Sequence, residues 1–164
     1  MVTVDPQNGC ITSLYNKNDN FESLASGGCG NELQAFKDTP LDDDAWNIDP
    51  GTLDHHTSLT QAGSVKLVAN SPFRAVIRVS RTWQNSKFVQ DITLYADSNH
   101  LDVVNNIDWH KTHIRLKTAF PLAVLSSIAI YKIPYETIAR PTTRTYIGSY
   151  QLSKPSEAAI ALSV

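Results

Sequence analysis

The feature that most constrains the fold is an alternation of apolar and polar residues that continues, with short interruptions, from Ser64 to about Leu122. Successive side chains of a β-strand point to opposite faces of a sheet, so a strand with one buried face shows this period of two. The stretch "FRAVIRVSRTW" is the clearest case and predicts a half-buried strand. The residues expected on its apolar face are Phe73, Ala75, Ile77, Val79 and Trp83, and those on its polar face are Arg74, Arg78 and Ser80.

The same pattern predicts further strands in "KFVQDITLYA", "HLDVVNNIDW" and "HIRLKTAFPL". Short polar connections at 84–86 and 97–100 indicate that consecutive strands are antiparallel neighbours. The predicted inward residues are Phe88, Ile92 and Leu94, then Leu101, Val103, Ile107 and Trp109, then Ile114, Leu116 and Phe120; His113, Arg115 and Lys117 are predicted to face away.

The N-terminal stretch "VTVDPQNGCITSLYNK" predicts a β-hairpin, because its Asn-Gly pair is a strong turn signal between two apolar runs. Helical periodicity is nearly absent, and the best candidate for a helix is a short one at 21–28. The fold class predicted for residues 1–164 is therefore all-β, as a single antiparallel β-sandwich domain. Packing two broad sheets together is the natural way to bury one face of each.

Composition narrows the classes of partner. The formal net charge is -2, so neither a nucleic acid nor an anionic membrane is expected as partner. No apolar run approaches the roughly 20 residues that span a bilayer. The start, "MVTVDPQNG", shows no signal peptide, and a cytoplasmic location is expected. The abrupt start also suggests a piece cut from a longer chain.

The two cysteines, Cys10 and Cys29, can pair, but two thiols do not make a disulfide framework. We expect both to be reduced. They are also too few for a structural zinc site, and no histidine lies near them in sequence.

Two pairs of histidines are candidate metal ligands. His110 and His113 are an odd number of residues apart, so in a regular strand they point to opposite faces and converge only if a turn lies between them. The alternative is a strand corner whose polar side chains bond to a neighbour. His55 and His56 are adjacent and diverge in the same way. We therefore expect no metal site in this chain.

A long polar loop covers residues 37–51, on a scaffold whose other connections are short. Long loops in compact domains are often functional. Its stretch "PLDDDAWNIDPG" resembles a calcium loop only faintly, since it lacks the glycine and the distal glutamate of that pattern. Trp46 either folds onto a core or is presented to a ligand, where its ring can stack on a sugar while carboxylates accept hydroxyl hydrogen bonds. The candidate substrate-rim residues are Asp44, Trp46 and Asp49.

No nucleophile or phosphate loop stands out. The sequence shows no Ser-His-Asp spacing, glycine-rich phosphate loop or paired-cysteine motif. Glycosidase chemistry needs two carboxylates facing each other across a bond, and the sequence singles out no such pair. No catalytic residue is assigned to this chain.

Three motifs resemble the class II α-mannosidases of glycoside hydrolase family 38. They are "GNELQAFKDTPLDDDAWNID", "DWHKTHIRLKTAFPL" and "YKIPYETIARPTTR", and they occur in the order of that family's β domain. The matching residues are Gly30, Asn31, Leu33, Gln34, Phe36, Asp38, Pro40, Asp44, Ala45, Trp46, Asn47 and Ile48; Asp108, Trp109, His110, His113, Leu116, Lys117, Phe120 and Pro121; and Ile133, Pro134, Tyr135, Ile138, Arg140, Pro141 and Thr142.

The resemblance implies a fold, an activity and a cofactor. Family members hydrolyse terminal α-mannosides with retention, using zinc and an aspartate nucleophile held in an upstream α/β barrel that a helical bundle follows. The residues present here would belong to the β domain, a supersandwich like that of galactose mutarotase. Zinc is thus expected in the parent's barrel and not in this chain. The expected partners are that barrel and an α-mannoside carbohydrate, and His110 and His113 would be scaffold residues.

The resemblance stops near Thr145, because "TYIGSYQLSKPSEAAIALSV" lacks the tryptophan segment that usually follows in the family. An incomplete domain is therefore expected. Two other interpretations stay open: a freestanding carbohydrate-binding module with Trp46 as stacking platform, and a sandwich that binds no ligand.

Overall fold

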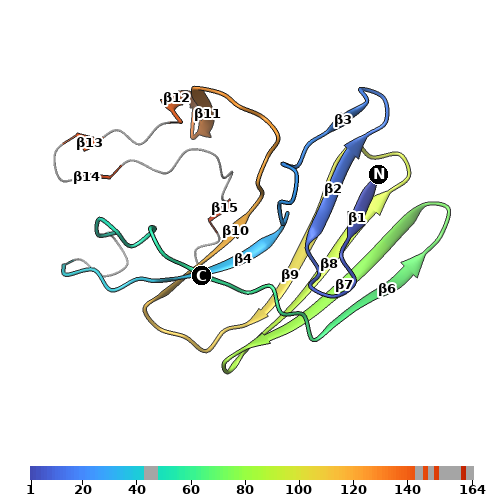
Figure 1. The fold of residues 1–164 in the computed structure, drawn as a ribbon, viewed down its shortest axis with the longest axis horizontal. Helices are drawn as coiled ribbons and strands as arrows, with labels where there is room; N and C mark the ends of the chain where they lie inside the picture. Colours follow the sequence, from blue (N-terminus) through green and yellow to red (C-terminus); the bar gives the residue numbers. More distant parts are fainter. Residues whose placement is uncertain (43–47, 143–145, 148–149, 152–159, 162–164) are drawn as a thin grey trace.

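The computed structural model describes residues 1–42, 48–142, 146–147, 150–151 and 160–161, and these contain strands and no helix. The broader layer is the antiparallel sheet β6-β7-β8-β9 (Figure 1). Its strands are β6 (Ser64–Asn70), β7 (Arg74–Trp83), β8 (Ser86–Tyr95) and β9 (Leu101–Asp108). These strands form where the sequence alternates, so the predicted all-β, antiparallel fold is confirmed.

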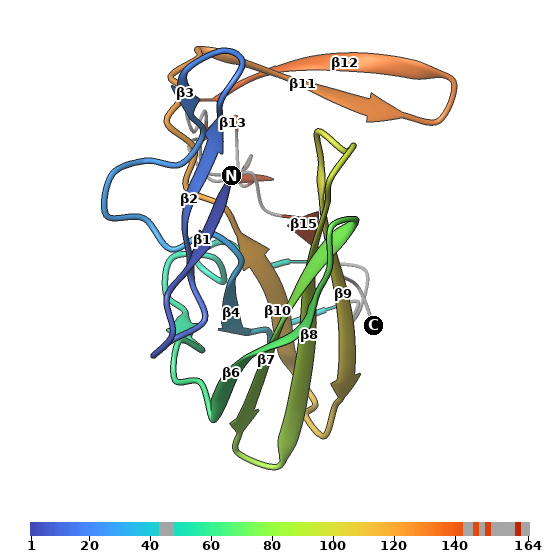
Figure 2. The same ribbon diagram turned by 90° about the vertical axis from the view of Figure 1, so that its right-hand side faces the viewer.

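Smaller sheets cover the inner face of this layer (Figure 2). One has the order β1-β2-β3 and another the order β15-β10-β4-β5. Their strands are β1 (Val2–Val4), β2 (Ile11–Asn16), β3 (Phe21–Glu22), β4 (Glu32–Lys37), β5 (Thr57–Ser58), β10 (Ile114–Ala119) and β15 (Ile160–Ala161). The described part of the chain is thus a sandwich with one broad layer and one divided layer.

Two hydrophobic clusters fill the space between the layers. In one, Phe88 of β8 packs with Leu33 and Ala35 of β4 and with Leu116 of β10. In the other, Val79 of β7 and Ile92 of β8 pack with residues of the N-terminal sheet. The predicted inward faces of β7, β8 and β9 are therefore the core faces. Trp109 and Phe120 pack against the first and second cluster respectively, and both are partly exposed.

Phe73 does not follow the predicted pattern. Its side chain is 77% exposed, because β7 begins only at Arg74 and Phe73 lies in the turn before it. In that turn the Phe73 carbonyl accepts a hydrogen bond from the backbone N–H of Ala96 at 2.9 Å. Backbone pairing of the turn with the end of β8 takes precedence over burial of the ring.

The predicted N-terminal hairpin is present, with Val2 opposite Leu14 and Thr3 opposite Ser13. Its turn requires a glycine, since Gly9 has φ +73° and a Cβ there would lie 2.5 Å from a methyl carbon of Val79. The best helical candidate in the sequence, 21–28, does not form a helix. This segment pairs as β3 with β2, and Leu24 then bridges to Leu122, so tertiary pairing overrides a weak helical pattern.

The expectation of reduced cysteines is also wrong in this structure. Cys10 and Cys29 form a disulfide, with their Cα atoms 4.9 Å apart. Beside it, the backbones of Ile11 and Gly30 exchange hydrogen bonds of 2.9 and 2.8 Å. The fold brings the thiols together by pairing the start of β2 with the residue that leads into β4, which their spacing in the sequence does not reveal.

A long hairpin of β11 (Ile128–Ile133) and β12 (Glu136–Pro141) extends away from the sandwich (Figure 2). It exposes several apolar side chains, among them Ile130, which is 74% exposed. The remaining pair is β13 (Tyr146–Ile147) with β14 (Tyr150–Gln151).

Candidate functional site

The long polar loop at 37–51, called the acidic loop from here on, begins at the end of β4, and the chain returns to the sheet at β5. Two of its predicted rim residues, Asp44 and Trp46, lie outside the described residues. The third, Asp49, is half-buried, and its Oδ2 accepts a hydrogen bond from the backbone N–H of Leu41 at 2.9 Å. This bond joins the two arms of the loop on either side of residues 43–47, so Asp49 helps to close the loop.

The start of the loop is held by an ion pair. Asp38 directly follows β4, and its Oδ2 lies 2.8 Å from Nη2 and 3.0 Å from Nε of Arg115 on β10. The other carboxylate oxygen, Oδ1, is buried without a hydrogen-bond partner among the described residues. An unsatisfied buried acceptor is costly. The Asp38 carboxylate thus has capacity for one more donor on the loop side of the sheet.

The outward face of β4 and β10 forms a platform beside this ion pair. The ring of Phe36 is buried, the ring of His56 packs against it with centroids 5.2 Å apart, and Lys117 Nζ lies 5.2 Å above it. These residues come from strands and from the far arm of the loop. Sequence periodicity predicts the outward direction of Arg115 and Lys117, but not their partners on β4.

His110 and His113 lie in the connection between β9 and β10, where they are structural. His110 Nε2 lies 2.8 Å from Asp108 Oδ1, and its backbone N–H donates to Ser86 Oγ at 3.0 Å. His113 has φ +54°, and its carbonyl accepts a hydrogen bond from the backbone N–H of Asp38 at 2.8 Å. The corner that carries the histidines therefore anchors the start of the acidic loop.

The described residues do not fit a zinc site. Nowhere in 1–42 or 48–142 do three or more His, Cys, Asp or Glu side chains gather closely enough to hold a metal ion. His55 is exposed, and His56 contacts the ring of Phe36.

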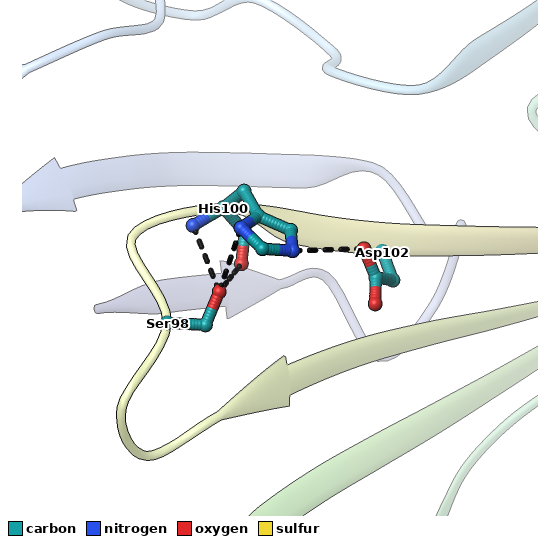
Figure 3. A network of polar contacts seen from close by, with 3 residues as sticks. All are labelled: Ser98, His100 and Asp102. Atoms are coloured by element: carbon teal, nitrogen blue, oxygen red, sulfur yellow. Dashed lines mark hydrogen bonds and ion pairs between the residues drawn. The ribbon is translucent and has the colours of Figure 1, made fainter.

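The structure brings together a Ser-His-Asp run that sequence reasoning misses. In the hairpin between β8 and β9, Ser98 Oγ lies 2.9 Å from His100 Nδ1, and His100 Nε2 lies 3.5 Å from Asp102 Oδ1 (Figure 3). Ser98 Oγ also accepts a hydrogen bond from the backbone N–H of His100 at 3.2 Å. Since His100 is largely exposed and Ser98 is engaged by the turn itself, the network shapes the hairpin and lacks the desolvated setting that activates a nucleophile.

Asn31, which belongs to the first family-like motif, is a core residue. It is fully buried with φ +61°, and its Oδ1 accepts a hydrogen bond from Gln90 Nε2 at 3.4 Å. Gln90 Nε2 also donates to Asn105 Oδ1 at 2.7 Å. This network links the two layers, so the part of the motif at Gly30 and Asn31 serves the packing of the domain.

Four charged groups among the described residues have pKa values displaced by their surroundings. The hydrogen bonds between Arg78 and Asp91 raise the pKa of the arginine and lower that of the aspartate. Hydrogen bonds from the Ser13 hydroxyl and from the backbone N–H groups of Leu24 and Leu14 lower the pKa of Glu22. Burial lowers the pKa of Arg81, whose guanidinium donates to the carbonyl of Leu59. None of these groups lies in the acidic loop.

Most of the chain matches the model of a known protein family. The model of the glycosyl hydrolases family 38 C-terminal domain matches residues 1–151. Fold and site together define an all-β domain with a platform on β4 and β10 and a long acidic loop. The chain belongs to the family of glycosyl hydrolase family 38 C-terminal domains.

Individual relatives agree with this assignment. The chain is 31% identical to "Alpha-mannosidase 2C1" of Mus musculus over 150 residues, which are 86% of this chain and 14% of that protein. It is 32% identical to "Alpha-mannosidase G" of Dictyostelium discoideum over 141 residues, which are 82% of this chain and 13% of that protein. The chain therefore spans about a seventh of the length of these relatives.

Proposed function

We propose that residues 1–164 form a β domain of an α-mannosidase that hydrolyses terminal α-mannosides with retention, using zinc and a nucleophile held in a separate barrel. The family match and the names of the relatives support this proposal. The chain covers only a small part of those relatives, so the activity belongs to the whole protein. The domain's own role is to support the barrel and to shape the rim of the sugar site.

The observation that carries this role is the anchoring of the acidic loop. The loop is fixed at its start by the Asp38–Arg115 pair and by the His113 carbonyl, and Asp49 closes its two arms. Because the two described arms of the loop are held at these points, ligand binding on this side of the domain has a lower entropic cost. We propose that this side of the domain faces the barrel, and that Asp44, Trp46 and Asp49 line the substrate rim.

The chemistry offered by this rim is binding and orientation. Carboxylates of Asp44 and Asp49 would accept hydrogen bonds from sugar hydroxyls, and the indole of Trp46 would cover an apolar sugar face. Retaining hydrolysis needs an acid and a nucleophile on opposite sides of the glycosidic bond. In this proposal both lie outside the domain.

The test is made in the whole enzyme that contains this domain. Trp46→Ala is expected to lower kcat/KM for an aryl α-mannoside by at least about tenfold, a loss of about 1.4 kcal/mol of transition-state binding, at an unchanged melting temperature. Leu41→Ala, an exposed residue of the same loop, serves as the control and should keep full activity. Unchanged kcat/KM in Trp46→Ala would remove the loop from the sugar site.

We also propose a cytoplasmic location for the parent. No helix among the described residues is long and apolar enough to cross a membrane. The disulfide argues in the opposite direction, because reducing compartments keep such thiols free. Counting the free thiols of the parent enzyme, alkylated at cell lysis, separates the two possibilities.

A further inference from the structure

We propose that a cleft between the β2–β3 turn and the β8–β9 hairpin binds a neutral carbohydrate. The cleft has a volume of about 800 Å³, within the range of small-ligand sites. Its lining shares no residue with the acidic loop or with the platform on β4 and β10. It is therefore a separate site from the substrate rim proposed above.

The floor of the cleft is apolar. It is formed by Leu14 of β2, Leu94 at the end of β8 and Leu101 at the start of β9. Leu14 and Leu101 also pack against the hydrophobic core, which keeps the floor in place. An apolar floor of this kind can take up the C–H face of a pyranose ring, whose burial from water is favourable.

The walls are polar and carry unused hydrogen-bonding capacity. The side chains of Asn18 on one wall and of Asp97 and Asn99 on the other are exposed, and none has a hydrogen-bond partner within the described residues. A carboxamide offers donors and an acceptor, while a carboxylate offers acceptors only. Because each sugar hydroxyl both donates and accepts, such a mixed set suits hydroxyls on neighbouring ring carbons.

Both walls are shaped before any ligand arrives. On the β2–β3 turn, Asn16 bonds to Asp19 through its side chain and accepts from the backbone N–H of Asn18 at 3.0 Å. On the β8–β9 hairpin, the Ser98–His100–Asp102 network fixes the loop between its strands (Figure 3). Preorganised walls reduce the ordering cost of binding. The role of the Ser-His-Asp run is therefore to shape one wall of the cleft, because the run is too exposed to act as a catalytic triad.

The charge of the lining decides the class of ligand. Of the residues that carry a fixed charge, the lining contains the carboxylates of Asp19 and Asp97 and the ammonium group of Lys17. No excess of positive charge is present to hold a phosphate or sulfate. With hydroxyl-binding groups on both walls, the geometry points to an uncharged sugar.

The experiment is a calorimetric titration of the 164-residue chain with methyl α-mannoside, α-mannobiose, methyl α-glucoside and inorganic phosphate. We expect at least one of the sugars to bind with Kd on the order of millimolar, as is common for a small exposed site. We expect phosphate not to bind. The double variant Asp97→Ala/Asn99→Ala and the single variant Asn18→Ala should each weaken sugar binding by about tenfold. Asn106→Ala, an exposed residue of β9 outside the cleft, is the control and should bind like the parent chain.

The substituted side chains are exposed, so the variants are expected to fold, and their melting temperatures check this. The proposal is overturned if none of the sugars binds, if phosphate binds more tightly than every sugar, or if the wall variants bind unchanged. Sugar binding that is lost in Trp46→Ala and kept in the wall variants assigns the site to the acidic loop instead. The result is independent of turnover, so failure of the cleft leaves the proposed mannosidase function standing.

Discussion

The carboxylate of Asp38 and the guanidinium of Arg115 form a two-point ion pair between the end of β4 and β10, with distances of 2.8 and 3.0 Å. Their side chains are only 17% and 25% exposed. A second Asp-Arg pair, Asp91 with Arg78, makes bonds of 2.7 Å on the open face of the β6-β7-β8-β9 sheet. The second pair is more exposed, and its arginine binds both oxygens of the carboxylate, whereas Arg115 binds only Oδ2 of Asp38.

Asp38→Asn is expected to lower the free energy of unfolding by about 1–3 kcal/mol, because it leaves Arg115 partly buried without its counter-charge. Asp91→Asn should cost less than about 1 kcal/mol, since water and salt screen the exposed pair. Urea denaturation of both variants measures the two values. Equal losses would mean that the loop anchor contributes no more than a surface ion pair.

Truncation of Phe88, in the core, and of Phe73, in the turn before β7, should change stability by very different amounts. Phe88 is 1% exposed in the core, so Phe88→Ala is expected to cost about 3–5 kcal/mol through lost burial and the cavity left behind. Phe73→Ala should change stability by less than about 0.5 kcal/mol, because the ring is already in water. Thermal melts of the two variants decide this. A cost of more than 2 kcal/mol for Phe73→Ala would show that its ring is buried in solution.

What the sequence predicts well is the local part of this fold. The period of two identifies β7 to β10 and their inward faces, because it is a property of each strand alone. It does not predict where a strand ends, and Phe73 therefore falls in a turn. This periodicity also cannot predict contacts between segments that are distant in the sequence, such as the disulfide or the ion pair of Asp38 with Arg115.

The candidate site shows the same limit. The motif around Asp38 and the acidic loop is visible in the sequence, and so is the corner at His110 and His113. That the corner anchors the loop follows only from the antiparallel register of β4 and β10, where Ile114 lies opposite Lys37. The sequence does not predict the cleft either, because the walls of the cleft come from turns that are far apart in the chain.

The disulfide should contribute measurably to stability. Cys10 and Cys29 are 19 residues apart, and closing a loop of that length is worth roughly 3 kcal/mol in the chain-entropy model. Reduction, or the double variant Cys10→Ser/Cys29→Ser, is therefore expected to lower the melting temperature by several degrees. Thiol titration of the parent enzyme under denaturing conditions, with alkylation at cell lysis, then reports the state in the cell. Two free thiols in the cell would support the cytoplasmic location. The absence of free thiols would count against it.

The chain alone is expected to leave aryl α-mannosides intact. The sequence singles out no carboxylate pair for glycosidase chemistry, and the described residues contain no group of three or more His, Cys, Asp or Glu side chains that could hold a metal ion. Incubation of the purified chain with an aryl α-mannoside, with and without added zinc, measures this. Turnover that persists through further purification would assign catalytic residues to this domain and contradict the proposed division of labour. Metal analysis after dialysis should likewise find no stoichiometric zinc.

Glu22 should make the N-terminal sheet sensitive to acid. Its carboxylate accepts hydrogen bonds from the Ser13 hydroxyl and from the backbone N–H groups of Leu24 and Leu14, which lower its pKa from the model-compound value of 4.5. A carboxyl whose pKa is lower in the folded state stabilises that state above its unfolded pKa, and this stability is lost as the pH falls through the folded pKa. The parent chain should therefore melt at a higher temperature than Glu22→Gln at pH 7, and the difference should shrink as the pH is lowered from 4.5. Glu136→Gln, on the exposed β12 strand, is the control and should track the parent at both ends of the titration. A difference between the parent and Glu22→Gln that stays constant from neutral to acidic pH would show that the carboxylate charge is not what holds β2 to β3.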